Sequence, residues 1–362
     1  MMREFLPCIA MIMVQIGYAG MNILSKLAID SGMSPLVMVT YRQIVATIII
    51  SPFAYFWERK TRPRITSATL FQIFLSSLFG IAGNQCLYFI GLKYSTPTIG
   101  CALTNLLPAV TFIMAVPFGM EKVGLRRKAG QAKVLGTVMC VGGAMLMSFY
   151  KGIRIPIPDS AIHWRYVDSI TESGSSNDKV TLLGSLILIA SVISWGAWFI
   201  MQAKVSETFS APYSSTALMC LMGSIECGII AVTADHQVSA WSLHSSIRLI
   251  TSLYSGLVAS AFAIYLMSWC IEKKGPLYVS AFSPLLLVIV AVIGWALLAD
   301  KLYMGSVVGS VLIVMGLYAV LWGKDMEMKE KNSVDEKNLS LEGEEDKEKG
   351  KLELPVYSNG RA

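Results

Sequence analysis

The sequence has few of the residues from which enzyme sites are built. It contains 3 histidines in 362 residues, and His163, His236 and His244 all fall between the long apolar segments. We therefore expect no histidine at membrane depth to bind haem, hold a metal or relay a proton. The sequence also lacks a Gly-rich phosphate loop and a nucleophile beside a plausible base, so it offers no basis for catalysis, for a cofactor or for ATP-driven work by this chain alone.

Paired cysteines and charge are scarce as well. The 7 cysteines have no close Cys-x-x-Cys spacing and lie inside apolar segments, which is typical of small core residues rather than of disulfides or metal ligands. They are Cys8, Cys86, Cys101, Cys140, Cys220, Cys227 and Cys270. Only 15% of residues are charged, 54% are hydrophobic, and the mean hydropathy is +0.58. This composition excludes a pair of water-soluble domains and indicates a surface that faces lipid.

Long apolar segments are what the sequence has instead. A helix needs about 20 apolar residues to cross the hydrocarbon core of a bilayer. Ten segments satisfy this length, and we predict an all-α membrane protein with ten spans. They lie at about 5–27, 35–57, 68–92, 98–119, 130–149, 181–203, 213–233, 247–270, 276–299 and 303–322. The first could be mistaken for a signal peptide, but Gln15, Asn22 and Lys26 within it favour a membrane helix.

The ten segments form a repeat. Residues 95–123 reappear at 274–302, with Pro97 on Pro276 and Thr104 on Ser283, and the pair Glu121-Lys122 falls on Asp300-Lys301. Five spans per half is an odd number, so the second half must enter the membrane in the opposite orientation. We predict two inverted five-helix repeats, at 5–149 and 181–323, which is an architecture of many transporters.

Loop charges give an independent orientation. If the N-terminus is cytoplasmic, the short inside segments carry nearly all the basic residues, which are Arg3, Arg59, Lys60, Arg62, Arg64, Lys122, Arg126, Arg127, Lys128, Lys133, Lys204, Lys273 and Lys274. The short outside loops carry only Lys93, Arg248 and Lys301. Under the positive-inside rule both termini are cytoplasmic. The net charge of +6 is mostly this rim, and we expect contact with anionic lipid and no binding of nucleic acid.

Two polar segments remain outside the spans. Residues 150–180 would form an extracytoplasmic loop between the repeats, and a plain linker is the favoured interpretation. Residues 324–362 are rich in Lys, Glu, Asp, Asn and Ser and have few apolar residues. Such a composition cannot bury a core, so a disordered cytoplasmic tail is expected.

Polar residues within the spans are the candidates for a solute site, because hydrocarbon makes each of them costly unless it is paired or faces a cavity. Span 1 places Gln15, Ala19, Asn22 and Lys26 on one helix face, and span 6 places Ser191, Trp195, Trp198 and Gln202 on the same template. These faces would line a central cavity from opposite halves. The alternative is hydrogen bonding and aromatic packing between helices, with Lys26 snorkelling to the surface.

Spans 3, 4, 8 and 9 add further candidates. Span 3 carries Gly80, Asn84, Gln85 and Tyr88, and its counterpart carries Ser260, Tyr265 and Trp269. Spans 4 and 9 bring Thr104, Asn105, Pro108, Ser283 and Pro284. Prolines within spans free backbone carbonyls and can mark broken helices near a substrate, although kinks and close packing are alternatives.

Two charges lie deep in the predicted spans. Arg42 and Glu226 are each about seven residues from the outer end of their span, which is roughly 10 Å below the surface. They could pair as an outer gate, or Glu226 could carry a coupling proton. The alternative is that Arg42 snorkels outward and that a protonated Glu226 bonds to a neighbouring helix.

Several motifs together resemble a known family. The runs YRQIVATIIISPFAYFWERK, LTNLLPAVTFIMA and SPLLLVIVAVIGW, and the final GSVVGSVLIVMGLYAVLWGK, are similar to the plant nodulin-like, walls-are-thin-related branch of the drug/metabolite transporter superfamily. The resemblance covers residues 5 to about 324. It implies ten helices in two EamA repeats, and transport of amino acids or auxin-like organic acids at the plasma membrane or the vacuolar membrane. Asp300 departs from the Glu expected there.

The expected function is therefore transport of a small organic solute by alternating access. Amino acids are the first choice, an auxin or another organic anion is the alternative, and a non-transporting membrane scaffold or receptor is the alternative from another class. We expect the plasma membrane ahead of the vacuolar membrane, and the lipid bilayer as partner. A homo-oligomer is left open.

Overall fold

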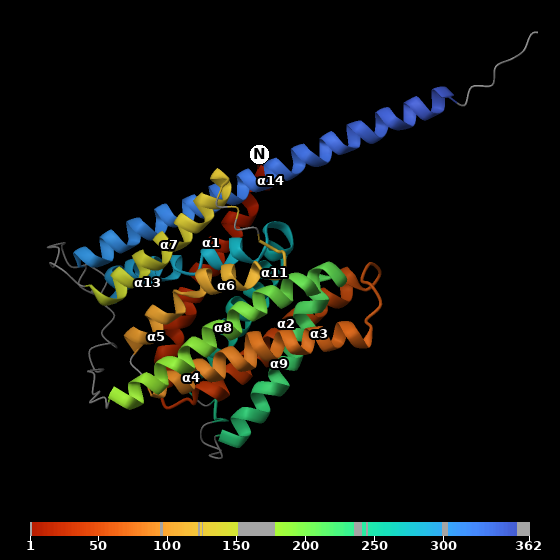
Figure 1. Cartoon of the computed structure of the whole chain (residues 1–362). Helices are drawn as coiled ribbons and strands as arrows, with labels where there is room; N and C mark the ends of the chain where they lie inside the picture. Colours follow the sequence, from red (N-terminus) through yellow and green to blue (C-terminus); the bar gives the residue numbers. More distant parts are fainter. Residues whose placement is uncertain are drawn as a thin grey trace, which may run out of the picture.

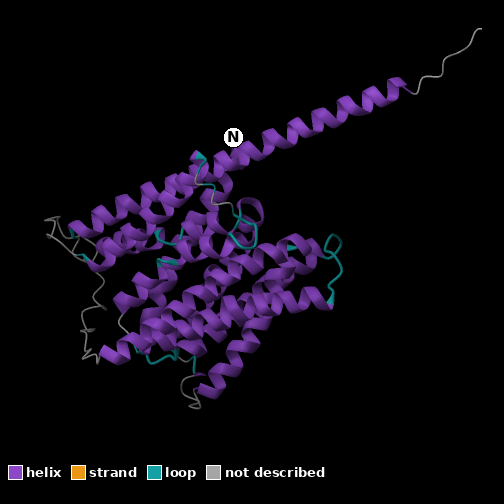
Figure 2. Ribbon diagram, viewed as in Figure 1, coloured by secondary structure: helices purple, strands orange, loops and turns teal. Residues whose placement is uncertain are grey.

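The computed structural model describes residues 2–94, 97–121, 124, 126–150, 178–234, 241–243, 245–298 and 303–352. Within these ranges the chain is helical and forms no β-strand (Figure 2). The helices pack as one bundle, from which the long last helix extends (Figure 1). The all-α prediction is confirmed. The three histidines, the pair Asp300-Lys301 and most of the loop between the halves, 151–177, lie outside the described residues.

Each half contributes the same series of helices. The first half comprises α1 (Met2–Asp30), α2 (Pro35–Glu58), α3 (Ser67–Ser77), η1 (Leu78–Gly83), α4 (Asn84–Lys93), α5 (Pro97–Thr104), α6 (Leu107–Ala115) and α7 (Lys128–Phe149). The second comprises α8 (Asp178–Thr208), α9 (Pro212–Ala234), α10 (Ser246–Tyr254), η3 (Ser255–Phe262), α11 (Ala263–Lys274), α12 (Pro276–Ala281), α13 (Leu285–Leu298) and α14 (Met304–Leu352). The segments η1 and η3 are π-helical.

Contacts between helix ends define two faces of the bundle. At the tail face, where α14 leaves the bundle, Lys274 Nζ lies 3.8 Å from Met328 Sδ, and Glu58 bonds to the start of α9. At the far face, Arg248 Nε donates to Ser31 Oγ over 3.2 Å. The first half starts at the tail face and the second half at the far face, so the two halves are inverted.

Both halves interrupt the same two spans. The third and eighth spans contain η1 and η3, which lie at corresponding positions of the repeat. The fourth span breaks between α5 and α6, and the ninth between α12 and α13, again at corresponding positions. Pro108 and Pro284 lie at these breaks, and each lacks the N–H that would bond the carbonyl four residues earlier. Of the interpretations open for these prolines, the structure shows broken helices in both spans.

These breaks also explain the span count. In the described part of the chain, nine helices are long and apolar enough to cross a membrane. The fourth predicted span is absent from that set because α5 and α6 are each too short alone. Taken as one crossing, α5 and α6 restore the predicted ten. Ile48, Ile113 and Leu182 are 66%, 68% and 64% exposed, as expected of side chains that face lipid.

Glycines hold the fifth and tenth spans together. Helix α7 runs beside α14 (Figure 1), and the two backbones approach closely at Gly136, Gly143, Gly309 and Gly316. A Cβ atom on Gly136 would lie 2.6 Å from the carbonyl oxygen of Gly316. Only glycine fits such a contact, so these residues serve the close packing of the two helices.

The C-terminal tail differs from the prediction. Residues expected to be disordered from 324 onward continue α14 as a helix to Leu352. The segment has many good helix formers and no proline before Pro355, so the helix of the tenth span propagates through it. Its first turns are also bound to the bundle, because Lys324 is buried and bonded to Glu121. The composition of the segment did not indicate this attachment.

Candidate functional site

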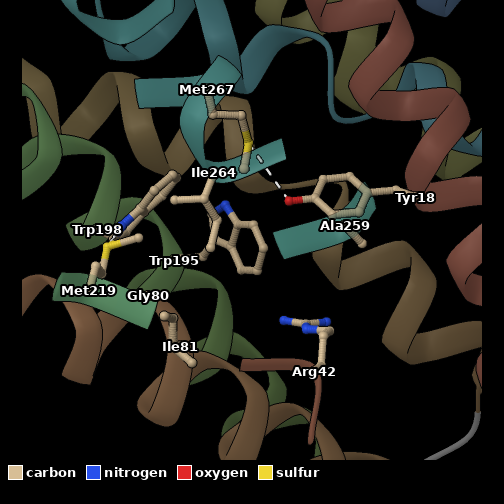
Figure 3. A pocket seen from close by; sticks show the side chains of 10 residues that line it. All are labelled: Tyr18, Arg42, Gly80, Ile81, Trp195, Trp198, Met219, Ala259, Ile264 and Met267. Atoms are coloured by element: carbon tan, nitrogen blue, oxygen red, sulfur yellow. Dashed lines mark hydrogen bonds between the residues drawn. The ribbon is translucent and has the colours of Figure 1, made fainter. Parts of the chain in front are cut away.

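A small cavity of about 20 Å³ lies between the two halves (Figure 3). Its walls come from α1, α2 and η1 of the first half and from α8, α9, η3 and α11 of the second. The residues are Tyr18, Arg42, Gly80, Ile81, Trp195, Trp198, Met219, Ala259, Ile264 and Met267. This volume is sufficient for one water molecule or little more. A larger solute therefore requires the walls of the cavity to move apart.

The two tryptophans form one wall. Trp195 and Trp198 come from successive turns of α8, and their ring centroids are 6.0 Å apart in an edge-to-face arrangement. Gly80, in η1, makes room for them: a Cβ atom there would lie 2.3 Å from Cδ1 of Trp198. The π-helical segment thus presents bare backbone to the indole, which is a common use of glycine and of π-bulges at functional sites.

Three hydrogen-bond donors in and around the cavity have methionine sulfur atoms as their acceptors. Trp198 Nε1 donates to Met219 Sδ over 3.2 Å, and Tyr18 Oη donates to Met267 Sδ over 3.9 Å (Figure 3). Arg42 Nη1 lies 3.3 Å from the sulfur of Met21, next to the cavity on α1. A thioether is a weak acceptor, so these donors would gain by exchanging it for a carboxylate oxygen.

Two further donors lack even a sulfur partner. Trp195 Nε1 and Arg42 Nε are buried, and neither makes a hydrogen bond to any described residue. No acidic residue is among the described residues that line the cavity. Buried donors without acceptors are costly, and this arrangement with the positive charge of Arg42 favours an anionic group as the missing partner.

Arg42 and Glu226 do not pair in this conformation. Arg42 points into the cavity (Figure 3), whereas Glu226 Oε1 accepts a hydrogen bond of 2.7 Å from Ser77 Oγ. No ion pair joins the two in the part of the chain that is described. Their sequence positions indicate a similar depth but not the direction in which each side chain faces, and the pair that was one interpretation of these charges is not formed here. Glu226 Oε2 is buried and has no partner among the described residues.

Two of the predicted amides form hydrogen bonds between helices. Gln202 joins α8 to α3, because its Oε1 accepts from Ser76 Oγ over 3.3 Å. Asn84 joins α4 to α8: Nδ2 donates to the carbonyl and hydroxyl oxygens of Ser191 over 3.0 and 3.1 Å, and Ser191 Oγ donates back to the Asn84 carbonyl over 2.9 Å. Asn84 therefore joins two helices, which agrees with the close packing that was its alternative interpretation.

The other candidates lie outside the cavity. Asn105 and Ser283 lie in the breaks of the fourth and ninth spans, and Tyr265 stacks on Tyr213 with centroids 4.2 Å apart. Gln15 is buried without lining the cavity, Gln85 is half-buried, and Asn22 is exposed. The structure thus brings together Trp195, Trp198, Arg42 and Gly80 from the predicted set.

Sequence reasoning missed Tyr18 and the methionines. Tyr18 is three residues from Gln15 and four from Asn22, so it lies between the two on span 1, and this spacing was the available signal. Met219 and Met267 carry no such signal, because a methionine in an apolar span is indistinguishable from any core residue.

Two inverted five-helix halves around a cavity form the architecture of a secondary transporter. The sequence profile of the EamA-like transporter family matches residues 5–149 and 182–322, and the chain belongs to that family. It is a multi-pass integral membrane transporter. The boundaries of the two matches agree with the two halves.

Relatives from Arabidopsis thaliana support the same assignment. The chain is 44% identical to WAT1-related protein At5g07050 over 89% of its own length and 81% of the relative. It is 39% identical to Protein WALLS ARE THIN 1 over 89% of its own length and 84% of the relative. A solved crystal structure, 14% identical, aligns with a TM-score of 0.60 over 87% of this chain and 98% of that chain, which shows a shared fold.

Proposed function

We propose that this transporter carries small organic carboxylates by alternating access. The observation that supports this best is the set of donors at the cavity, where Arg42 and Trp195 have N–H groups without a described partner and Trp198 and Tyr18 donate only to sulfur. A carboxylate supplies the missing acceptors and neutralises the buried guanidinium. The indole rings supply an apolar wall for the rest of the solute.

Within this class, an organic anion with an aromatic or apolar body is the solute we favour. The cavity wall offers an ammonium group no carboxylate among its described residues, and its methionines are poor acceptors. From the sequence, an auxin or similar organic acid was the alternative to amino acids. This cavity therefore fits such an organic acid better than a zwitterionic amino acid.

Amino acids remain the second candidate, and Glu226 is the observation in their favour. It lies seven residues from Met219 on α9, so both occupy one helix face about two turns apart. Its buried Oε2 has no partner in the described part of the chain. When the halves separate, that oxygen could accept from an ammonium group while Arg42 binds the carboxylate, or it could carry a coupling proton.

We further propose that the tail face is cytoplasmic and that the protein acts in the plasma membrane, with the vacuolar membrane as the alternative. The exposed basic loop between α2 and α3, with Arg59, Lys60, Arg62 and Arg64, lies at the tail face and supports this orientation. Labelling of a single cysteine placed in that loop by an impermeant reagent in intact cells would contradict it.

Transport by the purified protein in liposomes tests the solute class. An indole carboxylate should enter at least about tenfold faster than its uncharged amide at low concentration, because a charged hydrogen bond contributes about 1.5–3 kcal/mol. Arg42→Gln should remove this preference, and Arg59→Gln, which changes an exposed arginine at the end of the same helix, should retain it. Flux of neutral amino acids alone would favour the second candidate, and no flux of any solute would favour the scaffold.

A further inference from the structure

Four charged side chains form a cluster at the tail face. The carboxylate of Glu121, just beyond α6, accepts from Lys133 Nζ on α7 over 3.1 Å and from Lys324 Nζ on α14 over 2.6 Å. Glu327, one turn further along α14, accepts from Lys133 over 2.8 Å and lies 3.8 Å from Lys324. The side chains of Glu121 and Lys133 are 0% and 1% exposed. Two positive and two negative charges thus lie together with no net charge.

The cluster lies where the two broken spans reach the tail face. Glu121 follows α6 and lies between Gly119 and Gly124, whose φ angles are +69° and +48°. Gly275, with φ +88°, lies at the start of the ninth span and next to the cluster. A Cβ atom on Gly275 would be 3.5 Å from both Glu121 Oε1 and Lys324 Nζ. Helices α6 and α12, the tail-side parts of the broken spans, also pack on each other.

Stability alone does not explain charges at this place. Buried ion clusters lose much of their attraction to desolvation, and apolar side chains of similar size often give equal or greater stability. A charged cluster at the edge of the tail face can be hydrated, whereas an apolar contact cannot. Glu327 is 31% exposed and Lys324 10% exposed, so water can hydrate the charges once the helices part. Both the closed and the opened arrangement are then accessible.

We propose that Glu121, Lys133, Lys324 and Glu327 are positioning residues that form a latch, which ties the end of the fourth span to the fifth and tenth spans beside the start of the ninth span and closes the cavity to the tail face. The latch opens in each transport cycle. Lys324 and Glu327 follow the tenth span, so the first turns of the C-terminal helix belong to this gate. The proposal rests on alternating access and does not depend on which solute is carried.

Two buried positions can report on the latch. Ser280, on α12, lies on the tail side of the break in the ninth span, and Thr251, on α10, lies near the far face; both are 0% exposed. In a cysteine-free background, Ser280→Cys and Thr251→Cys are made separately, in the purified protein in lipid nanodiscs where both faces are reachable. The rate of reaction of each introduced thiol with an impermeant reagent is measured without any solute.

Glu121→Gln removes the buried one of the two carboxylates that Lys133 and Lys324 share, and it should weaken the latch strongly. We expect the reaction rate at position 280 to rise by about tenfold or more while the rate at position 251 falls or stays constant, because opening one face closes the other. No rise at position 280, or an equal rise at both positions, would overturn the proposal. Arg127→Gln with Glu330→Gln is the matched control, since this ion pair is 73% and 47% exposed and should matter little.

A variant with all four residues replaced tests the latch even if Glu121→Gln fails to fold. Replacing Glu121, Lys133, Lys324 and Glu327 by methionine removes every charge of the cluster and leaves none stranded. We expect a stable protein in which the thiol at position 280 stays unreactive and solute flux falls, because the contact no longer opens. Wild-type flux in this variant would show that the cluster is structural only. If accessibility shifts as expected but no solute is carried by the wild type, the latch stands and the proposed function fails.

Discussion

Gly80 and Trp198 meet without space for another atom between them. A Cβ on Gly80 would lie 2.3 Å from Cδ1 and 2.5 Å from Cγ of the indole, closer than real contacts allow. Trp198 is itself 2% exposed and bonded to Met219, so it has little freedom to retreat. The shape of the cavity wall therefore depends on the absence of a side chain at position 80.

Gly80→Ala should consequently impair transport. The added methyl group must push the Trp198 ring away from Met219 or displace η1, and overpacking of this kind costs about 1–3 kcal/mol. We expect the maximal flux to fall by about tenfold or more at a membrane abundance near that of the wild type.

Gly228→Ala is the matched control for Gly80→Ala. Gly228 also lies in a membrane helix, but a Cβ there would make only an ordinary 3.6 Å contact with Thr40. Flux should be close to wild type. Equal losses in the two variants would show that any alanine for glycine harms the bundle, and would remove the argument from the Trp198 contact.

Trp195→Phe separates solute binding from folding. Trp195 Nε1 has no partner in the described part of the protein, so its loss removes no hydrogen bond seen there. If the N–H binds a carboxylate, the KM for an organic anion should rise by about tenfold, with thermal stability in detergent nearly unchanged. Trp198→Phe, by contrast, loses the bond to Met219 and should lower the stability. An unchanged KM in Trp195→Phe would contradict the assignment of this donor.

Much of the architecture could be predicted from the sequence, because membrane helices are recognisable by their length and hydropathy. The repeat offset, the inverted halves and the breaks at Pro108 and Pro284 all follow from local patterns. The tail could not be predicted in this way, since its helix depends on continuity with the tenth span and on the contact of Lys324 with Glu121.

The site was predictable only in part. The energetic cost of a polar side chain in the membrane shows that it needs a partner, but not the direction in which the side chain faces. Hydrocarbon requires that a buried amide or charge have a partner, but not whether that partner is a helix or a solute. Asn84 finds its partner in Ser191, 107 residues away, and no spacing in the sequence indicates this. Arg42 was found because a charge is rare at that depth, and Trp195 because it shares a helix face with Trp198 and Gln202, whereas the methionines that accept from the neighbouring donors were not found.

The contact between α7 and α14 offers a test with adjacent residues. A Cβ on Gly143 would be 2.8 Å from the carbonyl oxygen of Gly309, whereas a Cβ on Gly142 would meet nothing within 4 Å. Gly143→Ala should separate the helices and destabilise the protein by about 1–3 kcal/mol. Gly142→Ala should be neutral or stabilising by up to about 1 kcal/mol, since alanine favours the helix. The free energy of unfolding in detergent measures both, and equal values would contradict the close approach of the two backbones.

Glu58 at the tail face joins the second span to the seventh. Its carboxylate, in a residue only 8% exposed, accepts from the backbone N–H groups of Tyr213 and Ser214 over 2.9 and 2.6 Å. These groups belong to the first turn of α9, where N–H groups lack partners within the helix and the helix dipole favours a negative charge.

Glu58→Gln should therefore destabilise the protein. Glutamine keeps the shape but offers one acceptor oxygen and no charge, so we expect a loss of about 1–2 kcal/mol, and more for Glu58→Ala, which leaves both N–H groups unsatisfied. Glu207→Gln, an exposed carboxyl near the end of α8, should change little. The measurement is the free energy of unfolding of each purified variant in detergent. Equal effects of Glu58→Gln and Glu207→Gln would show that the helix start gains nothing from this carboxylate.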